Sequence, residues 1–343
     1  MEKSQSHLKI LLLLENNRYR TEPRVRPQVE ALQEAGHQMV VLCPHYEGEA
    51  WYKEMNGVHV YRFPVWAGGS KVISYISEFI LATFVMSLMT VWLWMRHGMD
   101  VLHICNPPDT LFVAGFIPKL AGKKIVYDIR DLSAELYASK FGRTDGAMYR
   151  FLLWLERVSC KFADYVLVVN ESYRQIAETR GGVPSERIGV VRIAKDLENV
   201  RPQGIKPALK EKADTIIAFL GHMAKQDGVD FLLESLHHLQ EELGHTDWYC
   251  ILVGPADDQG MLDQLVAELG LGDRVEFAGY QPNAEWISIL STADICVEPS
   301  PANPLNNVST MVKLMDYMAL SKPIVTYDLP EHRYTAGAAA LYA

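Results

Sequence analysis

The chain has few cysteines, and no two of them are closely spaced. The five are Cys43, Cys105, Cys160, Cys250 and Cys296, with no C-x-x-C pair among them. Cysteines scattered in this way exclude a disulfide framework and a cysteine zinc site, and they are typical of reduced core residues in the cytosol. The polar amino terminus, Met-Glu-Lys-Ser-Gln-Ser-His, shows no secretory signal either. We therefore expect a cytoplasmic protein with no metal site.

The chain also lacks an excess of positive charge. It has 33 Lys and Arg against 42 Asp and Glu, a formal net charge of −9. Residues 1–200 carry 24 basic and 22 acidic side chains and residues 201–343 carry 9 and 20, so the net charges are +2 and −11. The clustered basic and aromatic pattern of nucleic-acid binders is absent. We expect no nucleic-acid partner, and we expect the first half to meet any anionic acceptor.

Neither half has G-x-G-x-x-G after its first apolar run, which disfavours a dinucleotide-binding dehydrogenase. What the chain does have is an alternation of β-rich apolar runs with helical stretches, such as the helix expected over residues 27–35. The expected strands are 8–14, 39–43, 101–104, 124–127 and 165–169, then 216–220, 249–253, 275–277, 295–297 and 324–326. This alternation predicts an α/β fold with parallel sheets covered on both faces. The length of 343 residues predicts two Rossmann-like domains, 1–203 and 204–343.

One long segment contains no charge. It runs from Phe79 to Met95 and is followed at once by Arg96 and His97. Its length is borderline for a bilayer span, and a spanning helix would place strands of one sheet on opposite sides of a membrane, which disfavours that interpretation. Two interpretations remain open. The segment is either a buried helix or an interfacial helix whose Trp92 and Trp94 lie at the depth of the lipid headgroups.

Residues 303–325 combine a polar loop, a short helix and a buried strand, which together suit a nucleotide. Ser309 and Thr310 are expected to cap the helix and leave backbone N–H groups free, where a diphosphate prefers to sit. Lys313 and Asp316 lie three residues apart on one helix face. They offer a cation for phosphate and a carboxylate for ribose hydroxyls.

The same helix also has the spacing of an ordinary amphipathic core helix, through Met311, Leu314, Met315 and Met318. The pattern K-x-x-(E/D)-Y-M-A-x-x-K-P-I-V from Lys313 to Val325, however, resembles the donor-nucleotide segment of retaining glycosyltransferases of family 4, which have the GT-B fold. The resemblance implies two Rossmann-like domains whose parallel sheets face a cleft. The first would bind the acceptor and the second the nucleotide sugar. It also implies carboxyl-terminal helices that this chain, ending at Ala343, is expected to lack.

Loops of the first half are expected to meet at one sheet edge. The loop of residues 15–26 carries Asn16, Arg24 and Arg26, and the two guanidinium groups suit an anionic acceptor or the donor diphosphate. After the strand at 101–104, an Asn-Pro-Pro-Asp turn is expected to aim Asn106 and Asp109 into the same region. Solvated arginines with surface salt bridges are the alternative for the first of these loops.

Two further patterns of the first half resemble the same family. They are E-P-R-V-R at residues 22–26 and Y-D-x-(H/R)-(D/E)-L at residues 127–132. The second implies that Asp128 and Asp131 position acceptor hydroxyls and that Arg130 touches phosphate, unless these groups only cap helices or form loop salt bridges. His103 is either a contact near the acceptor or a satisfied core histidine.

The second half opens with a loop, residues 221–228, that resembles the family's first diphosphate loop. Gly221 permits close approach of the backbone to a phosphate, and His222 and Lys225 supply positive charge. The family usually has Arg and Lys where this chain has His222 and Asp227, so Lys225 is expected to replace the missing cation.

Later loops of the second half complete the expected donor site. Tyr280 and Gln281 are expected at the nucleobase, with a simple β-turn as the alternative. The family's paired glutamates fall on Val308 and Asp316, so sugar contacts are expected from Glu298, Asn306, Asn307 or backbone amides.

The function expected from these residues is that of a metal-independent retaining glycosyltransferase of the EC 2.4 class, with no cofactor. It would move a sugar from a UDP- or GDP-linked donor to a lipid-linked or polysaccharide acceptor. If the segment from Phe79 to Met95 is the interfacial helix, the protein is expected to bind the inner membrane through it. The expected catalytic residues are Asp109, Asp128, Lys225 and Lys313, the two lysines stabilising the leaving diphosphate. The alternatives are a GT-B UDP-sugar epimerase and an inactive, membrane-associated partner of another transferase.

Overall fold

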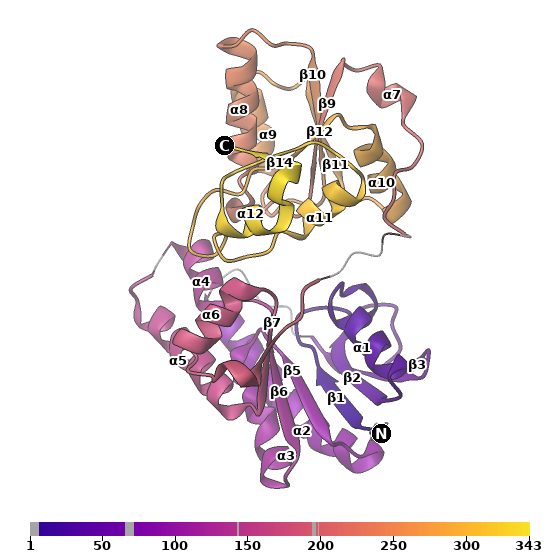
Figure 1. Cartoon of the computed structure of the whole chain (residues 1–343), viewed down its shortest axis with the longest axis vertical. Coiled ribbons are helices and arrows are strands. Elements are labelled where there is room, and N and C mark those ends of the chain that lie inside the picture. Colours follow the sequence, from indigo (N-terminus) through magenta and orange to yellow (C-terminus); the bar gives the residue numbers. More distant parts are fainter. Residues whose placement is uncertain (1–6, 66–71, 143, 194–196, 198) are drawn as a thin grey trace. The chain divides into compact units, whose positions relative to one another are not determined.

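The computed structural model describes residues 7–65, 72–142, 144–193, 197 and 199–343, so residues 1–6 of the polar amino terminus lie outside it. The chain forms two compact units (Figure 1), Met1–Ile193 (unit 1) and Ala194–Ala343 (unit 2). Each unit has its own sheet with helices packed on it. The predicted cleft between the two sheets stays a prediction.

The sheet of unit 1 has the strand order β3-β4-β2-β1-β5-β6-β7-β8 among the described residues. Every neighbouring pair is parallel except β3 and β4, which are antiparallel. The strands are β1 (Lys9–Leu13), β2 (Gln38–His45), β3 (Tyr52–Met55), β4 (Val58–Pro64), β5 (Val101–Cys105), β6 (Lys124–Ile129), β7 (Tyr165–Val168) and β8 (Ile188–Val190). Leu11 at the centre pairs with Val40 on one side and Leu102 on the other. All three are apolar and buried, as expected of a sheet covered on both faces.

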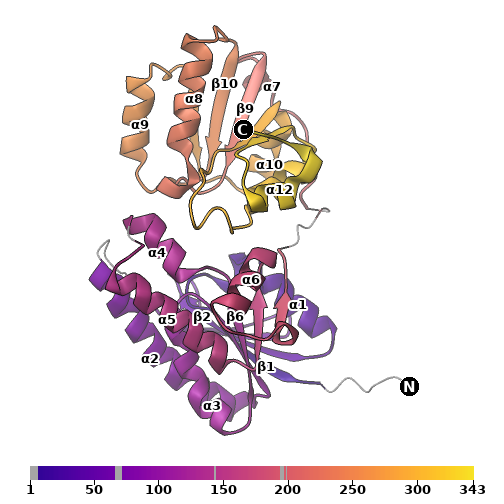
Figure 2. The same cartoon turned by 60° about the vertical axis from the view of Figure 1, so that its left-hand side comes forward.

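The helices of unit 1 connect these strands (Figure 2). The α-helices are α1 (Val25–Glu34), α2 (Val72–His97), α3 (Phe116–Leu120), α4 (Ser133–Phe141), α5 (Ala147–Phe162) and α6 (Glu171–Thr179), and the 3₁₀ helices are η1 (Tyr19–Thr21), η2 (Asp109–Gly115) and η3 (Ser185–Arg187). The chain moves from β4 to β5, β6 and β7 in one direction across the sheet. Right-handed crossovers therefore place α2, α3 and α5 on the same face, opposite to α1.

The sheet of unit 2 is parallel throughout its described strands, in the order β11-β10-β9-β12-β13-β14. The strands are β9 (Thr215–Leu220), β10 (Trp248–Val253), β11 (Val275–Gly279), β12 (Ile295–Glu298), β13 (Ile324–Thr326) and β14 (Ala340–Tyr342). The helices are α7 (Pro207–Lys210), α8 (Val229–Glu241), α9 (Gln259–Glu268), α10 (Asn283–Thr292), α11 (Val312–Ala319) and α12 (Pro330–Ala336), with η4 (Lys225–Asp227) and η5 (Gly337–Ala339).

The core of unit 2 lies on both faces of its sheet. Ile216 and Ala218 of β9 pack with α10 and α11, whereas Ile217 and Phe219 of the same strand pack with α8 and α9. Successive strand residues point to opposite faces, so a strand that is apolar at every position must be covered on both. The predicted pair of parallel, doubly covered sheets is therefore confirmed.

The structure adds a hairpin that the strand predictions omitted. Strands β3 and β4 are joined by Asn56-Gly57, and both residues have positive φ angles, 51° and 81°. An Asn-Gly pair of this kind forms the two-residue turn whose twist matches that of antiparallel strands. The hairpin extends the sheet beyond β2, and its apolar Val58 and Val60 are buried.

Candidate functional site

In unit 2, loops at the carboxyl edge of the sheet approach one another at glycines. A Cβ atom on Gly254, after β10, would lie 1.9 Å from the carbonyl oxygen of Gly221, after β9. A Cβ on Gly228 would lie 2.1 Å from the carbonyl oxygen of Pro299, after β12. Both φ angles are positive, 133° and 68°, so side chains are excluded by strain as well as by space. The glycines bring three loops together at the edge where α/β proteins bind ligands.

Lys313, in the first turn of α11, lies inside this group of loops. Its Nζ is 3.0 Å from Oε2 of Glu298 and 3.2 Å from Oδ1 of Asp227. Its side chain is 10% exposed, that of Asp227 is 17% exposed, and Glu298 is completely buried. A Cβ on Gly221 would lie 3.1 Å from Cε of Lys313, which places the Gly221 backbone against the lysine. The predicted residues Gly221 and Lys313 are therefore neighbours, and the charge of Lys313 already faces two carboxylates.

A second layer of buried polar groups lies behind Glu298. Nε2 of His332, in α12, is 3.9 Å from Oε1 of Glu298, and its Nδ1 lies 2.7 Å from Oγ1 of Thr326. His332 is fully buried, and burial lowers the pKa of its imidazole against the opposing effect of the glutamate. A neutral imidazole leaves Lys313 as the charge partner of Glu298. Neither His332 nor Thr326 was among the predicted site residues.

The predicted capping of α11 by Ser309 and Thr310 is wrong. The helix begins at Val312 after Met311, and no side chain caps it. The Ser309 hydroxyl donates instead to the carbonyl oxygen of Leu305, and that of Thr310 donates to Glu331. Local turn contacts and a buried carboxylate thus take both hydroxyl groups.

The other predicted donor residues of α11 and of the loop before it are buried or half-buried. Asp316, on the same helix face as Lys313, is 5% exposed. Asn307 is half-buried in the loop before the helix, where its backbone N–H donates to Asn303. The neighbouring Asn306 is buried, and its amide donates to the carbonyl oxygens of Gln226 and Pro301.

Several predicted donor residues lie exposed at this edge. His222 is paired with Asp257, with 2.6 Å between Nε2 and Oδ1. Lys225 is exposed and forms no ion pair with the residues that the structure describes. Tyr280 is 81% exposed directly after β11, and Gln281 next to it donates to the carbonyl oxygen of Ala278. The ammonium group of Lys225 and the ring of Tyr280 are therefore both accessible to a ligand.

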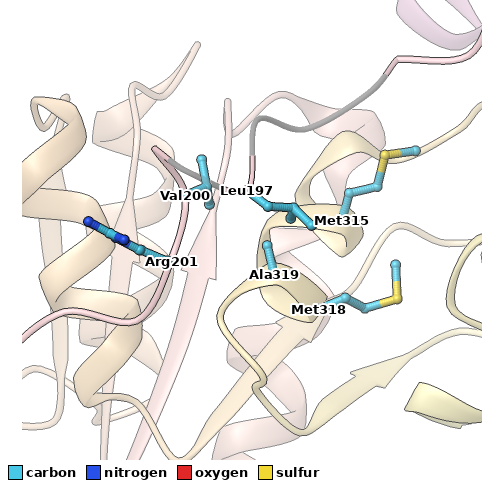
Figure 3. A pocket seen from close by; sticks show the side chains of 6 residues that line it. All are labelled: Leu197, Val200, Arg201, Met315, Met318 and Ala319. Carbon is cyan, nitrogen blue, oxygen red and sulfur yellow. The ribbon is translucent and has the colours of Figure 1, made fainter.

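An apolar cavity of about 500 Å³ lies elsewhere in unit 2 (Figure 3). Met315, Met318 and Ala319 of α11 line it together with Leu197, Val200 and Arg201. At about 100° per residue, these α11 positions lie roughly 120–160° around the helix from Lys313. The polar cluster, not this cavity, is therefore the candidate donor site.

In unit 1, the candidate site is a buried charge network at the carboxyl edge of the sheet. Arg24 Nη2 lies 2.6 Å from Asp128 Oδ1, and His103 Nε2 lies 3.2 Å from Asp128 Oδ2. Asp128 is completely buried and Arg24 is 3% exposed. Burial alone would raise the pKa of Asp128, but Arg24 and His103 hold it below its usual value. Asp128 is therefore an ionised carboxylate with a partner on each oxygen.

The network continues at Asn106, directly after β5. The amide of Asn106 donates to Asp109 Oδ1 over 2.9 Å and accepts from the backbone N–H of Arg130 over 2.6 Å and that of Asp131 over 3.2 Å. Tyr127 also donates its hydroxyl to Asp109. Burial raises the pKa of Asp109 and of Asp131. The Asn-Pro-Pro-Asp turn is thus fixed to the loop after β6.

Arg130 is held by the first loop of the chain. It forms an ion pair with Glu22, and its Nη1 donates to Asn16 Oδ1 over 3.3 Å. Glu22 also accepts from the backbone N–H of Arg24. Glu22 was not predicted, because its partner is far along the chain and no local pattern indicates the pair.

One predicted residue of unit 1 does not join this network. Arg26 forms an exposed pair with Glu30 one helical turn later, with 2.8 Å between Nε and Oε1. The two arginines of the Arg-x-Arg sequence thus have different environments. Arg24 is buried in the network and Arg26 lies in solvent on α1.

Ligand atoms of His103, Cys105 and Asp128 lie within 4.8 Å of one another, a spacing that a metal ion can use. The donor set does not fit a cation, however. Arg24 already occupies Asp128 and would place its charge beside the ion, and burial raises the pKa of the Cys105 thiol far above its usual value. The cluster is a hydrogen-bonded ion pair.

Glu15, two residues after the end of β1, is expected to make the stability of the protein depend on pH. It is 8% exposed, and burial together with the charge of Glu78 raises its pKa to about 7. Because the folded state keeps a proton that the unfolded chain releases, the stabilising effect is complete at low pH and is lost as pH rises through 7. We expect Glu15→Gln to stabilise the protein by roughly 2–3 kcal/mol at pH 8 and little at pH 4. Denaturant unfolding at both pH values measures this, and the exposed Glu34→Gln serves as the control. Equal effects of Glu15→Gln at both pH values would contradict the burial argument.

Family models match both units. The glycosyl transferase 4-like domain matches residues 21–194, and the glycosyl transferases group 1 domain matches residues 214–341. Alpha-D-kanosaminyltransferase of Streptomyces kanamyceticus is 23% identical over 182 residues, 51% of this chain and 45% of that protein. A putative colanic acid biosynthesis glycosyltransferase of Escherichia coli is 29% identical over 148 residues, 42% of this chain and 35% of that protein. These matches span less than half of either relative.

Solved structures agree with the family models. Sucrose-phosphate synthase of Thermosynechococcus elongatus covers 98% of this chain with 86% of its own, at a TM-score of 0.76 and 17% identity. Anabaena HepE in complex with UDP and glucose covers 96% of this chain with 83% of its own, at a TM-score of 0.65 and 16% identity. The predicted GT-B fold class is confirmed, and the chain belongs to the group 1 glycosyltransferases of the family 4 type.

Proposed function

We propose that the protein is a retaining glycosyltransferase that moves a sugar from a nucleoside diphosphate sugar to an acceptor bound by unit 1, without a metal ion or a cofactor. The observation that carries this proposal is the match of both units to glycosyltransferase domains, together with the loop cluster around Lys313 at the carboxyl edge of the unit 2 sheet. Glycines bring the backbone close there, and a phosphate needs such access.

In the proposed reaction, the bond from the anomeric carbon to the diphosphate breaks and a bond to the acceptor oxygen forms on the same face of the sugar. The acceptor proton passes to a phosphate oxygen of the leaving diphosphate. Charge develops on that diphosphate, so Lys225 and Lys313 are the groups expected to stabilise it. Lys225 is open to the ligand. We propose that the diphosphate displaces the partly exposed Asp227 from Lys313, while Glu298 stays buried.

The acceptor is proposed to be lipid-linked or a polysaccharide. Support comes from relatives with such names, among them a lipopolysaccharide core biosynthesis glycosyltransferase of Rhizobium meliloti, 35% identical over 108 residues, 31% of this chain and 29% of that protein. In unit 1, the paired and largely buried charges of Arg24, Asp128 and Arg130 lie at the carboxyl edge of the sheet. We also propose that the protein acts in the cytoplasm and contacts a membrane through α2. The membrane contact is supported by one helical segment, Ser77–His97, which is long and apolar enough to cross a bilayer by length and composition alone.

A panel of UDP- and GDP-linked hexoses tests the proposed chemistry. We expect one donor to raise the unfolding temperature, since a ligand at a hundred times its Kd stabilises the folded state by about 2.7 kcal/mol. NAD should produce no shift. We also expect slow hydrolysis of that donor without acceptor. NMR should show the released sugar first in the anomeric configuration of the donor.

Each other outcome contradicts part of this proposal. Release of the opposite anomer would exclude retention. Conversion of a UDP-sugar to its epimer without hydrolysis would favour the epimerase. Failure to bind any UDP or GDP compound would favour an inactive partner protein.

A further inference from the structure

The outer face of α2 is apolar and open to solvent. Ile80, Phe84, Leu88 and Trp92 follow one another at intervals of four residues and are 62, 60, 58 and 44% exposed. The opposite face, with Ala82, Met86, Thr90 and Leu93, is buried against the sheet and η2. The helix is therefore apolar on both sides, although Ile80, Phe84 and Leu88 on the outer side are more than half exposed.

Helix α3 continues this surface. Thr83 of α2 and Thr110 of η2 are joined by a hydrogen bond of 2.7 Å between their hydroxyl groups. Near the other end of α2, the ammonium group of Lys123 lies 6.0 Å from the ring of Trp94. Helix α2 and the segment that contains α3 thus run side by side (Figure 2). The exposed apolar residues of α3 are Phe116, Ile117 and Leu120, at 47, 56 and 87%.

Helix α5 adds a face that is both aromatic and basic. Phe112 and Phe116 contact the ring of Phe162 at the end of α5, at centroid distances of 5.6 and 5.0 Å, so this helix borders α3. Phe151 and Trp154 of α5 are stacked at 5.8 Å and are 47 and 55% exposed. The exposed basic residues of the helix are Arg150, Arg157 and Lys161, and none has an ion pair among the described residues.

We propose that the outer faces of α2, α3 and α5 form one surface that docks on an anionic lipid leaflet. An exposed apolar surface of this extent on a globular unit marks an interaction site. Large apolar side chains flanked by tryptophan and arginine are the composition of elements that lie in the membrane interface. The inference deepens the membrane contact of the proposed function and rests on it, but it does not depend on the transfer chemistry.

The contact is a docking on the surface, not a span. Helix α2 connects β4 and β5, which belong to the same sheet, and its buried face packs on β1 of that sheet. Inserting the whole helix across a bilayer would separate strands that are hydrogen-bonded in one sheet. Only the exposed face is available to lipid.

The charges of the surface select anionic lipid. The one acidic residue of α5, Glu156, is buried and paired with Arg180, so the outer face of this helix carries basic groups alone. Helix α3 contains no acidic residue. At the end of α2, the guanidinium of Arg96 lies 5.8 Å from the ring of Trp92. Basic groups at the edge of an apolar surface attract anionic headgroups.

Vesicle sedimentation with the whole chain and no nucleotide tests this surface. We expect binding to vesicles containing about 30% phosphatidylglycerol in phosphatidylcholine, weaker binding to phosphatidylcholine alone, and loss of the difference at high salt. Phe84→Gln with Leu88→Gln should reduce partitioning at least about tenfold on both vesicles. Arg150→Gln with Arg157→Gln should reduce it about tenfold on the anionic vesicles only.

Matched controls come from unit 2 and from the far strand of unit 1. Leu243 has the same 58% exposure as Leu88, and Lys53 is exposed on β3, so Leu243→Gln and Lys53→Gln should leave vesicle binding unchanged. No vesicle binding by the wild-type protein would overturn the proposal. So would a dimer in light scattering that Leu88→Gln dissociates, because a second copy would then cover the face. Donor binding by thermal shift, measured separately, shows whether the proposed function fails or the docking alone.

Discussion

Asp128→Ala is expected to destabilise unit 1 by about 3–5 kcal/mol, because it leaves the buried guanidinium of Arg24 without its counter-charge. Asp128 is completely buried, Arg24 is 3% exposed, and the two groups are 2.6 Å apart. His103 loses its partner in the same variant. Denaturant unfolding followed by tryptophan fluorescence measures the loss.

The chain supplies a matched control for this variant in the ion pair of Arg26, two residues after Arg24. Arg26 is paired with Glu30 at 2.8 Å, yet both side chains are about half exposed, 51 and 41%. Exposed pairs contribute at most about 1 kcal/mol, so Glu30→Ala should be nearly neutral. Arg24→Met combined with Asp128→Ala should recover part of the loss, because no unpaired charge remains. Equal small losses from Asp128→Ala and Glu30→Ala would show that the buried network does not stabilise unit 1.

Ten strands were predictable because their local pattern decides them, whereas β3, β4, β8 and β14 were not predicted. Residues 324–326 were predicted as a strand and form β13 with the same bounds, and the other predicted strands differ by a few residues at their ends. Sheets buried on both faces have continuous apolar runs, which the sequence shows directly. The hairpin at Asn56-Gly57 was missed although its turn signal is present, because β3 is short and its central residues, Lys53 and Glu54, are both polar.

The partners of the charged residues were not predictable in the same way. Arg130 was expected to touch phosphate, but its partner Glu22 is 108 positions away in the sequence. Glu298 was considered only as a contact to the sugar, whereas it is fully buried beside Lys313. Such pairs depend on which strand ends become neighbours in the sheet, and local spacing in the sequence does not indicate the order of the strands.

The capping error at Ser309 has a similar cause. A serine before a helix is a common cap, but its hydroxyl is equally able to bond to a carbonyl oxygen in a preceding turn. Here the carbonyl of Leu305 is in reach at 2.8 Å, and the helix begins three residues later, at Val312. The tertiary position of the loop decided between two local bonds that the sequence allows equally.

Lys313→Met is expected to have two separate effects. It removes the counter-charge of the completely buried Glu298, so we expect unit 2 to lose about 3–5 kcal/mol of stability. Under the proposed function it also removes a charged hydrogen bond to the diphosphate, so affinity for UDP or GDP should fall by about 1.5–3 kcal/mol. Denaturant unfolding and calorimetric titration measure the two effects independently.

A second substitution separates these two effects. Glu298→Gln combined with Lys313→Met leaves no buried unpaired charge, so stability should recover while the nucleotide affinity stays low. Lys225→Met is the complementary control, since Lys225 is exposed without an ion pair to a described residue and should affect affinity without changing stability. If Lys313→Met lowers stability and leaves affinity unchanged, Lys313 is only the counter-ion of Glu298. The diphosphate would then have to be bound by Lys225 and the glycine-lined loops alone.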